Sequence, residues 1–174
     1  MSEDFDLQLD ELEDACKAKG VQLYQYCLIR TPWDQARLWR QSRKRDEILG
    51  AVSKLEDAGA NFLAGCLMDV GPQPTAARVT NSLPGLSWHQ WGEAADYCPV
   101  GKDGKLDWEE DEGFRVLADE ARRLRLTSGY YWRFKDKPHV QLREKGVQQV
   151  YSWREIDDAM RDRFSTKRPS LVRH

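Results

Sequence analysis

The chain has 174 residues, of which 40% are hydrophobic and 10% aromatic, so it can bury one good hydrophobic core but not two independent ones. Its formal net charge of −2 and isoelectric point near 6.0 provide no basic excess, which argues against a protein that binds nucleic acid. No run approaches the roughly eighteen apolar residues of a membrane span, so we expect no stable membrane anchor. We predict a single domain over residues 1–174, and a monomer.

The N-terminal segment is acidic. Its first 14 residues carry seven Asp and Glu and no Lys or Arg, so the segment lacks the basic and apolar regions of a secretory signal. We therefore expect the chain to be cytoplasmic as synthesised. Phe5, Leu9, Leu12 and Cys16 recur at helical spacing and Gly20 follows them, which predicts an amphipathic helix over residues 5–19.

A strand followed by a helix is predicted next. Residues 21–30 are rich in the branched and aromatic side chains that are typical of strands. Thr31 then suits a helix N-cap, with Pro32 at the first helical position and Asp34 three residues after the cap. Further helical patterns cover residues 46–57 and 59–69.

A long loop precedes the second half of the chain. Residues 71–87 are rich in Pro and Gly and predict this loop. Residues 93–100 predict a strand, and the Asp-Gly turn within 101–107 predicts a hairpin partner for it. Residues 110–124 begin with acidic and end with basic side chains, as the helix dipole favours, and predict a helix.

The last part of the chain completes the predicted fold. Residues 128–134 and 138–143 predict a second pair of strands. Residues 148–164 predict a closing helix, and a basic tail occupies 165–174. Together these elements predict an α+β fold in which helices pack on a small antiparallel sheet.

The four cysteines are widely separated. Cys16, Cys27, Cys66 and Cys98 form no Cys-x-x-Cys pair and no dense disulfide spacing. We therefore predict buried thiols in a reducing compartment rather than disulfides or a cysteine-based zinc cluster.

The few histidines stand near carboxylates. Apart from His174 at the end of the sequence, they are His89, seven residues before Asp96, and His139, three residues after Asp136. Two imidazoles and one carboxylate are a common protein ligand set for catalytic zinc, and such a set leaves the fourth position to water. A second carboxylate outside the coordination shell could take the proton of that water.

Two residues make convergence of these side chains plausible. Gly92 permits a sharp bend between His89 and the strand that carries Asp96. Pro138 interrupts strand pairing just before His139, so the carboxylate three residues before His139 could reach the same centre. Spacing alone leaves open a structural His–Asp pair at each position.

The complete pattern is more specific. Residues 87–96 fit S-x-H-x-x-G-x-A-x-D, residues 136–139 fit D-x-x-H, and residues 30–39, RTPWDQARLW, precede both. The pattern resembles the zinc peptidases of the D-alanyl-D-alanine carboxypeptidase and L-alanyl-D-glutamate peptidase family, which cut the stem peptide of bacterial peptidoglycan. The resemblance covers about residues 24–142 and implies a sheet that carries a zinc site, similar to Hedgehog and DD-peptidase folds.

The resemblance also implies roles for named residues. His89, Asp96 and His139 would be ligands of Zn2+, and Asp136 would be the general base that activates the metal-bound water. Arg30 would bind an oxyanion or a substrate carboxylate, because a guanidinium can hold either one through two hydrogen bonds. The donor set favours zinc, although other divalent ions can occupy such a set.

Two polar residues would contact the substrate. Gln35 and Ser87 match polar positions of the family, although helix surface and turn positions explain them equally well. Trp88, Trp91, Tyr130, Tyr131 and Trp132 lie near the motifs and are interpreted as core residues or as walls of a substrate cleft.

The bond that is cut depends on finer features. Family carboxypeptidases often have Glu where this chain has Asp136, and many have Trp where it has Pro138. Both departures favour an L-alanyl-D-glutamate endopeptidase, and the absence of a signal favours a phage or prophage endolysin that reaches the cell wall after release. A D-alanyl-D-alanine carboxypeptidase and a catalytically inactive zinc-binding module remain the alternatives.

Overall fold

The computed structural model describes residues 3–73 and 77–167. Contacts along the chain divide it into two compact units, which we describe separately. Unit 1 comprises Met1–Ile29 and Trp91–Lys145, and unit 2 comprises Arg30–Gln90 and Gly146–His174. The single domain stays a prediction. Most of the predicted basic tail, residues 168–174, lies outside the described residues.

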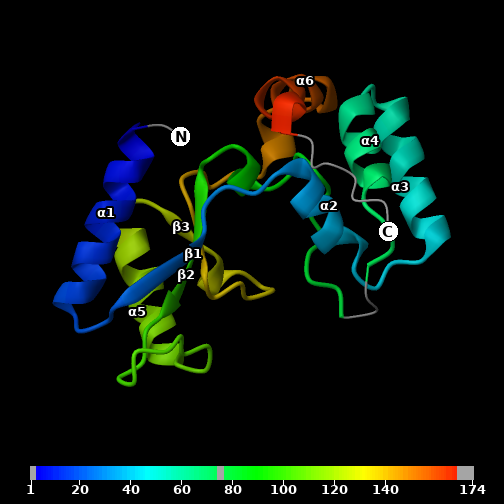
Figure 1. The fold of residues 1–174 in the computed structure, drawn as a ribbon. Helices are drawn as coiled ribbons and strands as arrows, with labels where there is room; N and C mark the ends of the chain where they lie inside the picture. The colour runs from blue at the N-terminus through cyan, green and yellow to red at the C-terminus, as the bar shows by residue number, and fades with distance from the viewer. Residues whose placement is uncertain (1–2, 74–76, 168–174) are drawn as a thin grey trace. The chain divides into compact units, whose positions relative to one another are not determined.

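In the described residues, unit 1 contains two α-helices, one 3-10 helix and a four-stranded antiparallel sheet with the strand order β1-β2-β4-β3. Figure 1 shows the helices α1 and α5 beside this sheet. The helices are α1 (Glu3–Ala18) and α5 (Asp111–Arg123), and the strands are β1 (Leu23–Cys27), β2 (Ala94–Pro99), β3 (Thr127–Ser128) and β4 (His139–Gln141). These elements confirm the predicted α+β class and its small antiparallel sheet.

The core of unit 1 lies between the helices and one face of the sheet. Phe5 and Leu12 of α1 and Phe114 of α5 are buried with Tyr97 of β2 and Val140 of β4 in one hydrophobic cluster. Because successive side chains of a strand point to opposite faces, the polar residues next to Tyr97 and Val140 project from the other face. The helices thus bury one face and leave the other to carry polar groups.

Two predicted strands differ from the structure. The strand predicted at 128–134 is wrong: only Thr127–Ser128 pairs with β4, and a 3-10 turn, η2 (Gly129–Tyr131), follows. Two contacts explain this: the Ser128 hydroxyl accepts a hydrogen bond from the Tyr130 amide, and the Tyr130 hydroxyl donates to Asp111 of α5, so the chain turns away from the sheet. The hairpin predicted after β2 is reduced to one bridge between Val100 and Leu106.

Unit 2 is helical, and its helix α4 contacts three others, namely α2, α3 and α6. The α-helices are α2 (Pro32–Arg40), α3 (Arg45–Asp57), α4 (Asn61–Asp69) and α6 (Trp153–Phe164), and the 3-10 helices are η1 (Trp88–Gln90), η3 (Val147–Gln149) and η4 (Ser165–Lys167). The helix predicted at 148–164 is therefore split into η3 and α6. Ser152 separates them, because its hydroxyl and Glu155 form the capping box that starts α6.

The predicted start of α2 is confirmed. The Thr31 side chain accepts a hydrogen bond from the Asp34 amide, and the Asp34 carboxylate accepts one from the Thr31 amide. Pro32 occupies the first turn, where its missing N–H has no cost. This cap fixes the point at which β1 of unit 1 leads into unit 2.

The cysteines agree with a further prediction. None of the four cysteines forms a disulfide, and only Cys27 is more than slightly exposed. Burial raises the pKa of the Cys16 thiol to about 12, so this thiol is inert near neutral pH. Within the described ranges, no helix combines the length and apolar character needed to span a membrane.

Candidate functional site

Three side chains of chemical interest form a row across the sheet of unit 1. Asp96 on β2 is the register partner of His139 on β4 and of Cys27 on β1. Directly opposed residues of antiparallel strands project from the same face. Gly92, with a positive φ of 71°, makes the predicted bend before β2. The sheet register therefore brings a carboxylate, an imidazole and a thiol to the face that α1 and α5 leave uncovered.

Asp96 and His139 are in direct contact. The His139 Nδ1 lies 3.0 Å from Asp96 Oδ1, and the two residues are only 7% and 5% exposed. The other imidazole nitrogen, Nε2, lies 2.9 Å from the Gln141 side-chain oxygen. Because an amide oxygen only accepts, this contact favours the tautomer with the proton on Nε2, in which Nδ1 offers a lone pair to a cation beside Asp96.

Gln141 is itself held in place. Its side-chain amide donates to the backbone oxygen of Arg143, which orients its oxygen toward His139. Arg143 in turn donates two hydrogen bonds to Glu93, one to each carboxylate oxygen. The bond from Nη2 to Oε1 is 3.0 Å long. The imidazole is thus oriented by a chain of buried and half-buried groups, which is typical of a metal-ligating histidine.

Asp136 lies at a close approach of two backbone segments. Its amide donates to Gly129 O at 2.9 Å, and its own oxygen accepts from the His139 amide at 3.1 Å. A Cβ atom at Gly129 would lie 2.5 Å from Asp136 O and 3.2 Å from His139 Cβ. Only glycine fits there, so Gly129 allows the loop with Asp136 to close beside His139. The Asp136 side chain is exposed to solvent.

The same loop is anchored to α5. Lys137 pairs with Asp111 at 2.8 Å, and the Tyr130 hydroxyl donates to the other oxygen of Asp111 at 2.9 Å. The bond from Lys137 is the largest cause of the lowered pKa of Asp111, and the bond from Tyr130 is the next. The Asp111 carboxylate is therefore ionised over the neutral range. The carboxylate of Asp136 is thereby carried on a loop that is fixed on both sides.

Unit 2 holds the remaining predicted site residues. Arg30, half-buried, donates from its guanidinium to the Gln35 side-chain oxygen at 3.1 Å. Gln35 is fully buried, and its amide donates to Ser82 O at 2.7 Å. The Arg30 amide donates to the backbone oxygen of His89, which is 1% exposed within η1, and Ser87 directly precedes this turn. Gln35 therefore positions Arg30 rather than lying on a helix surface.

The described structure thus gathers the predicted residues into two sets. Asp96, Asp136 and His139 belong to unit 1, and Arg30, Gln35, Ser87 and His89 belong to unit 2. The oxygen and nitrogen donors of Asp96 and His139 suit zinc. Trp88 and Tyr130 are core residues, whereas Tyr131 and Trp132 are exposed by 47% and 40%.

The sequence prediction did not identify three residues near this site. Gln141 could have been found from its spacing, because it stands two residues after His139 and shares its face of β4. Cys27 and Gly129 had no such signal. The role of Cys27 depends on the pairing of β1 with β2. The role of Gly129 depends on how closely the loop that contains Asp136 approaches η2.

The chain matches known peptidases. The family model described as VanY, D-alanyl-D-alanine carboxypeptidase, matches residues 1–148, which include every candidate residue named above. Among solved structures, the chain is similar to a mutant of the vancomycin resistance D,D-pentapeptidase VanY from a VanB-type resistance cassette, in complex with Zn(II). The sequence identity is 19% and the TM-score 0.49, with 88% of this chain and 82% of that chain covered. No curated protein matches the chain.

Proposed function

The chain belongs to the VanY family of D-alanyl-D-alanine carboxypeptidases, and on that basis we propose that it is a zinc peptidase that hydrolyses the stem peptide of peptidoglycan. The contact that carries this proposal is the buried pair of Asp96 and His139, with the imidazole oriented by Gln141. The arrangement supports a metal site, because Nδ1 faces the Asp96 carboxylate while Gln141 holds the other ring nitrogen, as in metal-ligating histidines.

Asp96 and His139 of unit 1 would hold the zinc ion, and the family pattern implies His89 as a further ligand. When bound, zinc supplies Lewis-acid chemistry, which polarises a carbonyl and makes water acidic enough to react near neutral pH. Each ligand is at most 7% exposed, and a low-dielectric environment strengthens electrostatic contacts with a cation.

The other residues would act on the substrate. Asp136 would accept the proton of the attacking water and pass it to the leaving amine, because a carboxylate near the reacting atoms is a common general base. Arg30, positioned by Gln35, would bind a carboxylate of the substrate through its guanidinium. Ser87, next to η1, would add a hydroxyl hydrogen bond.

We propose removal of the terminal D-alanine as the reaction. The match to the carboxypeptidase family over residues 1–148 supports this choice. A half-buried Arg30 held by a buried glutamine suits the free carboxylate at the end of a peptide, which only a carboxypeptidase must recognise.

A second candidate is the L-alanyl-D-glutamate endopeptidase. Asp136 stands where many carboxypeptidases have glutamate, and Pro138 stands where many have tryptophan. An enzyme of this kind would serve as a phage or prophage endolysin that is made in the cytoplasm and reaches the wall after release. These two sequence differences are the specific support for it.

Mass spectrometry of a digest distinguishes the candidates. Purified peptidoglycan and a defined stem pentapeptide would be treated with zinc-loaded protein, with chelated protein as the control. Loss of one D-alanine from the pentapeptide is the expected result. New N-terminal D-glutamate, with sugar chains that end in L-alanine, would instead establish the endopeptidase. Tight zinc binding without any zinc-dependent cleavage would leave a binding module and contradict both candidates.

A further inference from the structure

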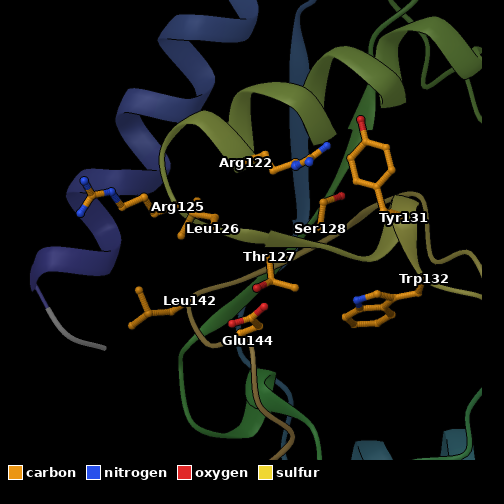
Figure 2. Close-up of a pocket in the computed structure, with 9 residues that line it drawn as sticks. All are labelled: Arg122, Arg125, Leu126, Thr127, Ser128, Tyr131, Trp132, Leu142 and Glu144. Carbon is orange, nitrogen blue, oxygen red and sulfur yellow. The ribbon is translucent and has the colours of Figure 1, made fainter.

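Unit 1 contains a pocket of about 680 Å³ beside the candidate site. It lies over the end of α5, the edge strand β3 and the segment that follows β4 (Figure 2). Its walls combine a cation, an anion, a hydroxyl and two exposed aromatic rings. These side chains are Arg122, Glu144, Thr127, Tyr131 and Trp132.

The pocket reaches to the candidate metal ligand His139. The Trp132 ring, which forms one wall, has its centroid 5.2 Å from that of the His139 ring. Thr127 is the register partner of Gln141, so it projects from the same sheet face as Gln141 and His139. An extended peptide advances about 3.4 Å per residue. A substrate that is cut beside His139 would therefore place a residue one or two positions from the reacting bond in this pocket.

The cationic wall is held in position before any ligand binds. The Arg122 guanidinium lies over the Tyr131 ring, 5.2 Å from its centroid. The Tyr131 hydroxyl donates to Asp119, a bond that raises the pKa of Tyr131 and fixes its ring on α5. In Figure 2 the Arg122 side chain runs toward Tyr131. An arginine supported in this way loses little conformational freedom when it binds a carboxylate.

The pocket offers opposite charges from two sides. Arg122 comes from the α5 side, and Glu144 comes from the segment after β4 (Figure 2). A second cation, Arg125, adopts a left-handed backbone with φ of 62°, a position at helix ends that usually favours glycine. A ligand that carries both charges would pair with both side chains, whereas a ligand that carries one charge would gain only one of these contacts.

We propose that this pocket is the subsite for a stem-peptide residue whose side chain ends in both an ammonium group and a carboxylate. Arg122 binds the carboxylate, Glu144 binds the ammonium, and the Trp132 ring covers the aliphatic stem between them and the backbone. This inference rests on the proposed function, because it takes the stem peptide as the ligand. It specifies the diamino acid of the peptide, which the candidate metal and arginine residues do not distinguish.

Four soluble stem pentapeptides that differ only in the third side chain test this assignment. The side chains would be diaminopimelate with both charges, lysine with the ammonium alone, 2-aminopimelate with the carboxylate alone, and uncharged norleucine. Dissociation constants would be measured by calorimetry with the chelated full chain, and kcat/KM with the zinc-loaded chain. The variants are Arg122→Gln, Glu144→Gln and the control Arg123→Gln, which alters a neighbouring arginine that pairs with Glu120 outside the pocket.

We expect diaminopimelate to bind roughly tenfold more tightly than norleucine. Arg122→Gln should remove the advantage that a carboxylate gives, Glu144→Gln should remove the advantage that an ammonium gives, and Arg123→Gln should change neither. Equal dissociation constants for the four peptides, or losses with Arg122→Gln that do not depend on the peptide, would overturn the proposal. If the wild-type chain cleaves none of the peptides, the proposed function fails, while the dissociation constants still test the pocket.

Discussion

His139 has its two ring nitrogens in different surroundings, one against a carboxylate and one against an amide oxygen. The second contact decides which nitrogen is available to a metal, although Gln141 itself binds none. Replacing Gln141 by leucine keeps the size of the side chain and removes the acceptor. The imidazole would then be free to change its tautomer and its orientation.

We therefore expect Gln141→Leu to weaken zinc binding by about 10- to 100-fold, with the chain still folded. Competition with a chelator of known affinity measures this, and circular dichroism checks the fold. Gln148→Leu, at an exposed position of η3, is the matched control and should bind zinc as the wild type does. Unchanged zinc affinity in Gln141→Leu would mean that the amide does not support a metal ligand.

Asp136 allows a separate test, because its proposed role is in catalysis and not in zinc binding. Asp136→Asn preserves shape but cannot accept a proton, so we expect kcat to fall by about 10²- to 10⁴-fold while zinc content stays at the wild-type level. Cleavage of the defined pentapeptide and metal analysis of the same samples measure both quantities. The exposed Asp103→Asn serves as control. Equal loss of zinc and of activity would make Asp136 a ligand instead.

Residues of the candidate site differ in how far the sequence could reveal them. The spacing of His89, Asp96, Asp136 and His139 and the cap at Thr31 are local patterns, so they could be read directly from the sequence. That the pairing of β2 with β4 brings Asp96 to His139 depends on a strand register between residues 43 positions apart. No local pattern encodes this register, nor the close approach that requires glycine at position 129.

At the scale of elements, the start of α4 depends on a different helix. The N-cap residue Ala60 has no side chain that can accept a hydrogen bond. Asp157 of α6 supplies the acceptors instead, at 2.8 Å from the Leu63 amide and 3.3 Å from the Phe62 amide, and it is fully buried. Arg161, at 2.6 Å, balances its charge. One carboxylate thus caps α4 and joins it to α6.

We expect Asp157→Ala to lower the free energy of unfolding by about 2 kcal/mol, because two buried amide donors lose their acceptor. Asp157→Asn, which keeps one oxygen, should recover part of the loss. Asp158→Ala removes a neighbouring carboxylate that also pairs with Arg161 but is 57% exposed, so it should change stability by less than about 0.5 kcal/mol. Denaturant unfolding of the three variants compares these values, and equal effects of Asp157→Ala and Asp158→Ala would show that the cap is unimportant.

The predicted helices and strands match the structure where several local signals agree. They differ from it where contacts with residues distant in the sequence help to determine the conformation. The helices with caps or clear periodicity, α2 and α5 among them, lie within a few residues of their predicted positions. Residues 128–134 are aromatic and read as a strand, but Tyr130 turns inward to bind Asp111, and η2 replaces the pairing. Tyr130 is buried, which agrees with the core interpretation of these aromatic residues, but its conformation differs from the predicted strand.

For the whole molecule, zinc binding is linked to folding, because the proposed ligands are Asp96, His139 and, from the family pattern, His89. An ion that binds only the folded chain stabilises it by mass action, whatever its role in catalysis. The unfolded chain retains the same side chains but not their arrangement, so most of the binding free energy adds to the stability of the fold.

Zinc at 100 times its dissociation constant should therefore add about 2.7 kcal/mol to the free energy of unfolding, which corresponds to a rise of roughly 5 to 10 °C in Tm for a chain of this size. Thermal unfolding with zinc and with chelator measures the difference. His139→Ala and His89→Ala should each abolish most of the rise, and an alanine at the terminal His174 should retain it. If His139→Ala abolishes the rise and His89→Ala does not, the metal is held by unit 1 alone, and Cys27, the register neighbour of Asp96, becomes the donor to test next.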